Sequence, residues 1–157
     1  MRVESFTSTN GLTRYILVDS SGVPVDVVLR FLRFKDNCGR ARNTLRAYCF
    51  HLKSYFEYLE FIGMSFQQIG MDELAGFIRW LQNNHRQKKI MSFPAATVST
   101  CSAQTINVYL STVYAFYDYL SRHEEYRLRL SDKLTRTIMG SRRGFKDFLY
   151  HINRTKQ

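Results

Sequence analysis

Positively charged side chains gather at the start of one predicted helix, where they could bind an anion. Arg40, Arg42 and Arg46 lie close together in the sequence, and Lys53 follows on the same predicted helix. The N-terminus of a helix is already positive, because its first N–H groups are unpaired. Arginines there cost stability unless an anion binds both them and the free N–H groups. We therefore predict a phosphate-binding edge here; an ordinary solvated helix face is the alternative.

Neutral hydrogen-bonding side chains line one face of a later predicted helix. Gln104, Asn107 and Ser111 lie away from its apolar positions, and Ser102 or Thr105 stands where the helix should begin. Amides can read base edges, and hydroxyls and amides can also hold phosphates. A purely structural alternative is that Ser102 or Thr105 only caps the helix. Spacing alone does not separate these roles.

The sequence predicts no catalytic, metal or cofactor site. His51, His85 and His123 are not in metal-ligand spacing. We find no glycine-rich phosphate loop and no Gly-x-Ser-x-Gly elbow. Cys38 and two further cysteines, Cys49 and Cys101, also lack metal spacing, so we expect reduced thiols in a cytosolic protein.

The charge balance predicts a polyanionic partner. The formal net charge is +10, from 23 Lys and Arg against 13 Asp and Glu. Such an excess favours nucleic acid or a membrane surface. No apolar run is long enough to span a membrane and we see no signal peptide, so we expect no membrane partner. The positive segments are 85–104 and 141–157, which contain Lys88, Lys89, Arg142, Arg143 and Lys146.

Two helices with aromatic buried faces must position these side chains. A sixteen-residue pattern that starts at Thr44-Leu45 and ends at Tyr58-Leu59 returns 61 positions later, starting at Thr105-Ile106. Its apolar positions recur at i, i+3/i+4 and i+7, the stripe of an amphipathic helix, and each copy starts at a threonine, a capping residue. We predict these helices over 43–61 and 103–121.

The other segments complete a predicted four-helix fold. A first helix over 24–36 has Pro24 in its first turn, and a third has Asp72 as its cap. Residues 1–11 should fray, Tyr15–Val18 should be a small strand or an extended arm, and 84–101 should be a long exposed loop. Residues 122–140 should form a short helix or an irregular strap, and a short amphipathic helix should follow Gly140. The fold class is all-α, a compact bundle with an extended lead-in.

In this order the elements resemble the N-terminal core-binding, SAM-like domain of tyrosine recombinases of the phage-integrase type. Thr44-Leu45-Arg46-Ala47-Tyr48 resembles the second helix of that family, and Asp72-Glu73-Leu74 with Trp80-Leu81 resembles the third. The sequence Thr105-Ile106-Asn107 with Phe116-Tyr117 resembles the fourth helix of that family. The opening, Arg14 to Pro24, resembles integrases of mobile elements that carry a short extended lead-in.

The resemblance implies a helical domain that closes over one side of duplex DNA as half of a C-shaped clamp. Its second and fourth helices would face the major groove, and a basic linker would lead to a separate catalytic domain. The domains would be an arm over 1–22, a core-binding domain over 23–121, and a strap and linker over 122–157. His151-Ile152-Asn153-Arg154 matches the H-x-x-R motif of the family's active site, but no tyrosine follows it, so we treat it as a coincidence.

We therefore expect a DNA-binding domain of an integrase or site-specific recombinase of a mobile element, without strand cleavage by this chain. Its partners would be double-stranded DNA, the catalytic domain of the same polypeptide and other recombinase protomers, in a bacterial cytoplasm. The alternatives are a helical protein-interaction module whose charge serves solubility, and an RNA-binding helical domain. The expected DNA contacts are Arg40, Arg42, Asn43, Thr44, Arg46, Lys53, Lys88, Lys89, Ser102, Gln104, Thr105, Asn107, Ser111, Arg142, Arg143 and Lys146.

Overall fold

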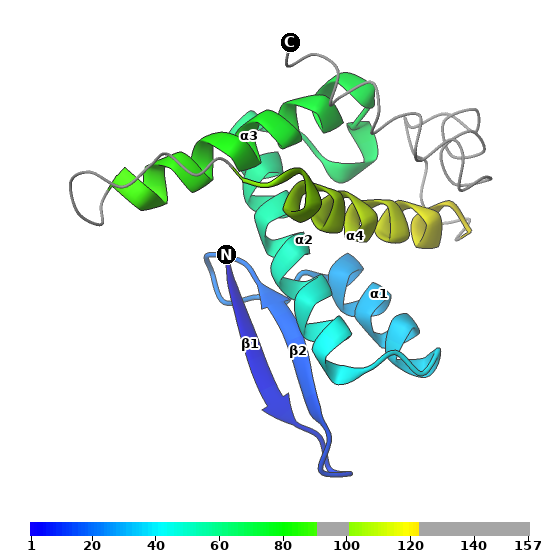
Figure 1. Cartoon of the computed structure of the whole chain (residues 1–157). Coiled ribbons are helices and arrows are strands. Elements are labelled where there is room, and N and C mark those ends of the chain that lie inside the picture. Colours follow the sequence, from blue (N-terminus) through cyan, green and yellow to red (C-terminus); the bar gives the residue numbers. More distant parts are fainter. Residues whose placement is uncertain (91–100, 123–157) are drawn as a thin grey trace. The chain divides into compact units, whose positions relative to one another are not determined.

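The computed structural model describes residues 1–90 and 101–122, and it describes side chains for 1–83 and 101–122. The chain divides into two compact units, Met1–Gly63 and Met64–Gln157, which we describe separately. The described residues form four α-helices and one two-stranded sheet, labelled in Figure 1. The expectation of a mostly helical fold of four main helices is therefore confirmed.

A β-hairpin opens the first unit. β1 (Arg2–Thr7) pairs antiparallel with β2 (Thr13–Val18), with Arg2 opposite Val18. The expected fraying of 1–11 is wrong, because the backbone of this polar segment is hydrogen-bonded by β2. The strand expected at Tyr15–Val18 is confirmed within β2. The hairpin packs on the two helices that follow it, as the blue ribbons in Figure 1 show.

A tight turn leads from the hairpin into α1 (Asp26–Asn37). The Asp19 carboxylate accepts hydrogen bonds from the N–H groups of Ser21 and Val23 at 2.8 and 2.9 Å, and Gly22 adopts a φ of +82°. Pro24 forms a β-bridge with Val18, so it lies before the helix and not in its first turn as predicted. The strand pairing thus extends to Pro24, and the helix begins only at Asp26.

The long helix α2 (Arg42–Ile62) carries the first copy of the repeated pattern. The predicted apolar stripe of this helix is confirmed, because its members are buried; they include Leu45, Leu52, Tyr55 and Phe56. The helix begins after Ala41, whose backbone is extended and whose side chain cannot cap it. The expectation that Thr44 caps this helix is therefore wrong, because two helical residues precede it.

The second unit contains a short 3-10 helix, η1 (Phe66–Gln68), and the helices α3 (Met71–Ile90) and α4 (Ala103–Ser121). At the start of α3 the Glu73 carboxylate accepts a hydrogen bond from the Gly70 N–H at 2.7 Å. Asp72 lies in the first turn and is not the cap that we predicted. The expected loop over 84–101 is wrong for 84–90, which continues α3. That stretch is rich in Gln, Lys and Arg and lacks Gly and Pro, so it favours a helix.

The apolar stripe predicted for α4 is buried, and α3 buries an apolar stripe as well. On α4 the buried residues include Ile106, Leu110, Val113 and Phe116, and on α3 they are Leu74, Phe77, Ile78 and Leu81. The Tyr117 hydroxyl donates a hydrogen bond of 2.7 Å to the Phe66 carbonyl, which ties α4 to η1. The expected boundaries of α4 are confirmed.

Two predicted elements lie outside the described residues. They are the strap over 122–140, apart from Arg122, and the amphipathic helix after Gly140. Among the described helices, none combines the length and apolar character that a bilayer span requires.

Candidate nucleic-acid interface

A carboxylate near the end of α1 organises the start of α2. Asp36 lies 2.7 Å from Arg42, measured from Oδ1 to Nη2, and 3.5 Å from Arg14 of β2, measured from Oδ2 to Nε. The Asp36 side chain is only 14% exposed, and the cluster joins three elements of the first unit. Arg42 therefore begins α2 already neutralised in part. Nη1 of Arg42 and Nε of Arg14 are buried without a hydrogen-bond acceptor.

A small cavity lies beside this cluster. Its volume is about 50 Å³, and its lining combines apolar side chains of the hairpin and helices with Arg14, Arg33, Asp36 and Arg42. Three arginines and one aspartate are among the residues that line it, so the lining carries net positive charge. The start of α2 is thus an electropositive part of the first unit.

The outer face of α2 holds the remaining basic residues of this helix. Asn43, Arg46 and Phe50 are exposed, and their i, i+3, i+7 spacing places them on one side, opposite the buried stripe. The Arg46 guanidinium lies over the Phe50 ring, 5.4 Å from its centroid. Lys53 continues the row and pairs with Glu57 at 3.3 Å. We call Asn43, Arg46, Phe50 and Lys53 the α2 stripe.

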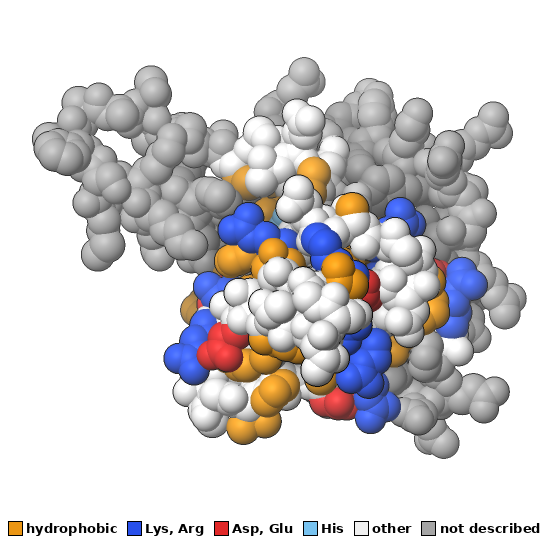
Figure 2. All heavy atoms as spheres, turned by 90° about the horizontal axis from the view of Figure 1, so that it is seen from below, with side chains coloured by type: hydrophobic (Ala, Val, Ile, Leu, Met, Phe, Trp, Pro, Cys, Tyr) orange, Lys and Arg blue, Asp and Glu red, His pale blue; other side chains and the backbone are white. Residues whose placement is uncertain are grey.

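The first turn of α2 retains only part of the unfavourable electrostatics that we expected, because Asp36 of α1 already pairs with Arg42. It contains no acidic residue and no side-chain cap, although Arg42 and Asn43 open the helix. Arg40 is exposed just before it, and Thr44 is half-buried within the turn. Figure 2 shows one face of the molecule, on which Lys and Arg side chains lie among hydrophobic ones, with acidic side chains beside some of them. An anion at this end would relieve the electrostatic conflict.

The start of α4 is built differently from the start of α2. The Ser102 Oγ accepts a hydrogen bond from the Thr105 N–H at 3.1 Å and lies 2.9 Å from the Thr105 Oγ1. Both hydroxyls therefore serve the helix cap, and Ser102 is the capping residue. Gln104 is exposed beside them and Asn107 is half-buried. The Ser111 hydroxyl donates a 2.7 Å hydrogen bond to the Asn107 carbonyl, so its proton is used within α4.

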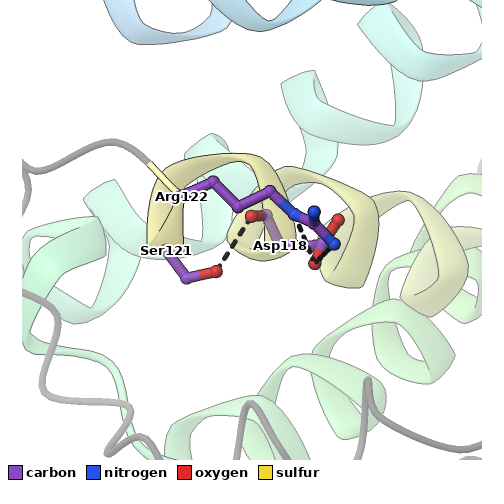
Figure 3. Close-up of polar contacts among 3 residues, drawn as sticks. All are labelled: Asp118, Ser121 and Arg122. Carbon is purple, nitrogen blue, oxygen red and sulfur yellow. Dashed lines mark hydrogen bonds and ion pairs between the residues drawn. The ribbon is translucent and has the colours of Figure 1, made fainter.

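The other end of α4 is closed by its own side chains. Arg122 lies against the Asp118 carboxylate, with Nη2 at 3.1 Å and Nε at 3.2 Å from Oδ1. The Ser121 hydroxyl donates to the Asp118 carbonyl at 2.9 Å. Figure 3 shows this arrangement. A cation at a helix C-terminus complements the dipole, so Arg122 has a structural role there.

The remaining predicted contacts belong to residues whose side chains lie outside the described part of the structure. Lys88 and Lys89 belong to the helical backbone of α3, but their side chains are outside the described set, and Arg142, Arg143 and Lys146 lie outside the described residues. The α2 stripe and the Gln104–Ser111 face belong to different units, and each is described within its own.

Two of the three cysteine thiols are buried in the described part of the chain, and one histidine is half-buried. Burial raises the pKa of the Cys49 thiol to about 12, and it also raises the pKa of Cys101, so neither is a ready thiolate. Burial lowers the pKa of His51, which favours the neutral imidazole. Within 1–83 and 101–122, no three His, Cys, Asp or Glu side chains converge as metal ligands would.

Phe50 and Asp36 are the residues of this region that the sequence did not single out. Phe50 had a signal, since it is an apolar residue that falls outside the apolar stripe of its helix. Asp36 had none, because its two partners lie on other elements, Arg14 on β2 and Arg42 on α2.

Comparisons with known proteins agree on one family. Residues 29–124 match the family described as phage integrase, N-terminal SAM-like domain. Transposase A from transposon Tn554 of Staphylococcus aureus, in strains Mu50 and N315, is 34% identical over 142 residues. The match covers 89% of this chain and 37% of those relatives. No solved structure matches significantly.

Proposed function

The chain belongs to the family of phage integrases with an N-terminal SAM-like domain, and on that premise we propose that it is the DNA-binding, core-binding part of a site-specific tyrosine recombinase. It clamps duplex DNA and presents it to a catalytic domain of the same polypeptide. Other protomers bind the same DNA, and the protein works in the cytoplasm on a mobile element. The chain spans 37% of the Tn554 relatives, which are named transposases. We assign strand cleavage to the proposed catalytic domain.

One observation carries the proposal, the α2 stripe. Among the described residues, no carboxylate pairs with Arg46, which is exposed and rests on the Phe50 ring. The stripe combines a guanidinium, an amide and an ammonium group beside a helix N-terminus. Guanidinium and amide groups can hydrogen-bond base edges, and all three can bind phosphate oxygens.

Two roles follow for the proposed residues. Cations fix the position on the duplex through phosphates, whereas Arg46 and the amides add sequence preference. The hydroxyl and amide side chains at the start of α4 contribute in the same way. The Ser102 and Thr105 hydroxyls are available for DNA only in part, because both also serve the helix cap. We assign phosphate contacts to Arg40, Arg42, Lys53, Lys88, Lys89, Arg142, Arg143 and Lys146, and base or mixed contacts to Asn43, Thr44, Arg46, Ser102, Gln104, Thr105, Asn107 and Ser111.

Substitution of Arg46 by alanine tests the proposal. Fluorescence anisotropy with a labelled random-sequence duplex, repeated over a salt series, should show weaker binding. The slope of log K against log salt should become shallower by roughly 0.9 if a phosphate contact is lost. The fold should change little, since an exposed cation–π contact contributes only about 0.5–1 kcal/mol.

Arg79→Ala is the matched control, because Arg79 is an exposed arginine of α3 outside the proposed set. It removes the same charge. Equal effects of the two substitutions would mean that net charge alone drives binding. Absence of any duplex binding at low salt would refute the proposed function.

A helical protein-interaction module is the second candidate. Phe61, at the end of α2, is 76% exposed, more than any other large apolar side chain among the described residues. In that case the unsubstituted chain should not bind duplex DNA. Its association with a protein partner should be lost in Phe61→Ser. The same anisotropy measurement therefore separates the two candidates.

A further inference from the structure

An exposed aromatic ring lies in the middle of the α2 stripe. Phe50 is 43% exposed, although its helix buries seven other apolar side chains on the opposite face. Its solvent side is bordered by Arg46 one turn before it and Lys53 one turn after it. A single exposed apolar residue is ordinary on a protein surface. Its position between two cations, with the amide of Asn43 on the same side, is what gives it meaning.

The charge around the ring defines the partner that could cover it. A protein or lipid apolar surface would have to bury Arg46 against apolar groups, which is costly. A polyanion instead satisfies the cations while it approaches the ring. Duplex DNA offers one apolar group in its major groove, the 5-methyl group of thymine. An aromatic ring in contact with that methyl group gains the free energy of apolar burial at one base pair.

We propose that Phe50 is a specificity-determining residue that contacts the methyl group of one thymine in the bound DNA. The inference rests on the proposed function, which it deepens. Arg46 lies against the same ring, so its guanidinium has fewer orientations to lose when it binds a base or phosphate. The ring thus acts twice, as a contact and as a support for Arg46.

The helix geometry sets where the thymine lies. Arg46 and Phe50 are separated by four residues, or about 6 Å along the helix axis. Base pairs are stacked at about 3.4 Å. Arginine most often reads guanine in the major groove. We therefore expect the thymine one or two base pairs from a guanine in the preferred site.

Uracil substitution tests the contact, because uracil differs from thymine only by the absent methyl group. The best duplex is first selected from a random pool with the full chain. It is then synthesised with uracil in place of thymine at one A·T pair at a time, and each affinity is measured by anisotropy. One substitution should weaken binding about fourfold, the effect expected for one buried methyl-sized group. Phe50→Ala should bind the thymine and uracil duplexes equally.

Phe34→Ala is the matched control. Phe34 is 40% exposed on α1 and also lies beside a cation, with the Lys35 ammonium 5.6 Å from its ring centroid. This variant should keep the fourfold discrimination. Circular dichroism confirms that each variant is folded before it is compared.

The outcomes separate the inference from the proposed function. Duplex binding with no thymine–uracil difference at any pair overturns the inference and leaves the proposed function intact. The inference also fails if Phe50→Ala still binds the thymine duplex about fourfold more tightly than the uracil duplex. That result is expected if the ring contacts the DNA backbone or another protein surface. If the chain binds no duplex at all, both proposals fail.

Discussion

Asp36→Asn should make the protein less stable and its DNA binding tighter. Asp36 forms a 2.7 Å ion pair with Arg42 and a 3.5 Å ion pair with Arg14. The shorter contact is an ion pair between partly buried groups, for which about 1.5 kcal/mol is intermediate between the values for exposed and buried pairs. The longer pair adds about 0.5 kcal/mol. We expect a loss of about 2 kcal/mol and a melting temperature lower by about 4–8 °C.

DNA binding should respond in the opposite direction, because the substitution releases Arg42. If Arg42 then contacts a phosphate, the salt slope becomes steeper by about 0.9 and the affinity rises. Circular dichroism melts and anisotropy over a salt series measure the two effects on the same samples. Binding is measured well below the melting temperature, so that both proteins are folded.

Asp26→Asn supplies the control on the same helix. Asp26 pairs with Arg30 at 2.8 Å, but both side chains are at least half exposed, so its loss should cost little stability. Both substitutions raise the net charge by one. If Asp36→Asn melts at the same temperature as Asp26→Asn, the buried cluster is not stabilising. If the two variants bind DNA equally, Asp36 does not restrain Arg42.

Three further expectations concern single residues. Ser102→Ala removes the cap that accepts the Thr105 N–H, so the urea midpoint should fall by the equivalent of about 1 kcal/mol, whereas Ser102→Asp should retain most of it. Burial lowers the pKa of His51, so its stabilising contribution is present above its ordinary pKa near 6.5 and is lost as the pH falls through the folded-state pKa. The free energy of unfolding, measured in urea, should therefore fall less between pH 7.5 and 5 in His51→Gln than in the unsubstituted chain. Equal losses of stability would exclude His51 as the source. Iodoacetamide at neutral pH should label exposed Cys38 rapidly and buried Cys49 only in urea, as read by mass spectrometry; rapid labelling of Cys49 in the folded protein would contradict its burial and its pKa of about 12.

The sequence alone determined the helices and their buried faces. The apolar spacing of α2 and α4 is set by the helical period, so the spacing by itself assigns Leu52, Phe56, Val113 and Phe116 to the core, where they lie. Gly39 directly follows Cys38, the C-cap of α1, and it adopts a positive φ that is favourable for glycine. Local signals of this kind act over one or two turns and need no distant partner.

Boundaries with competing local signals were harder to predict. Pro24 is suited to a first helical turn, yet its bridge to Val18 keeps it in the strand pairing. β1 has no strong strand pattern, and its conformation depends on hydrogen bonds with β2. In both cases a neighbouring strand decided between conformations that the local sequence allows about equally.

Tertiary structure alone decided which basic residues are free. Arg42 and Arg46 are alike in the sequence, both near the start of one helix. Folding brings Asp36 within 2.7 Å of Arg42 and leaves Arg46 exposed against Phe50. The helical period fixes the side of α2 on which each arginine lies, but the chain must fold back before α1 and β2 can supply a partner. Ion pairing depends on distances in space, and the spacing of residues along one helix does not contain them.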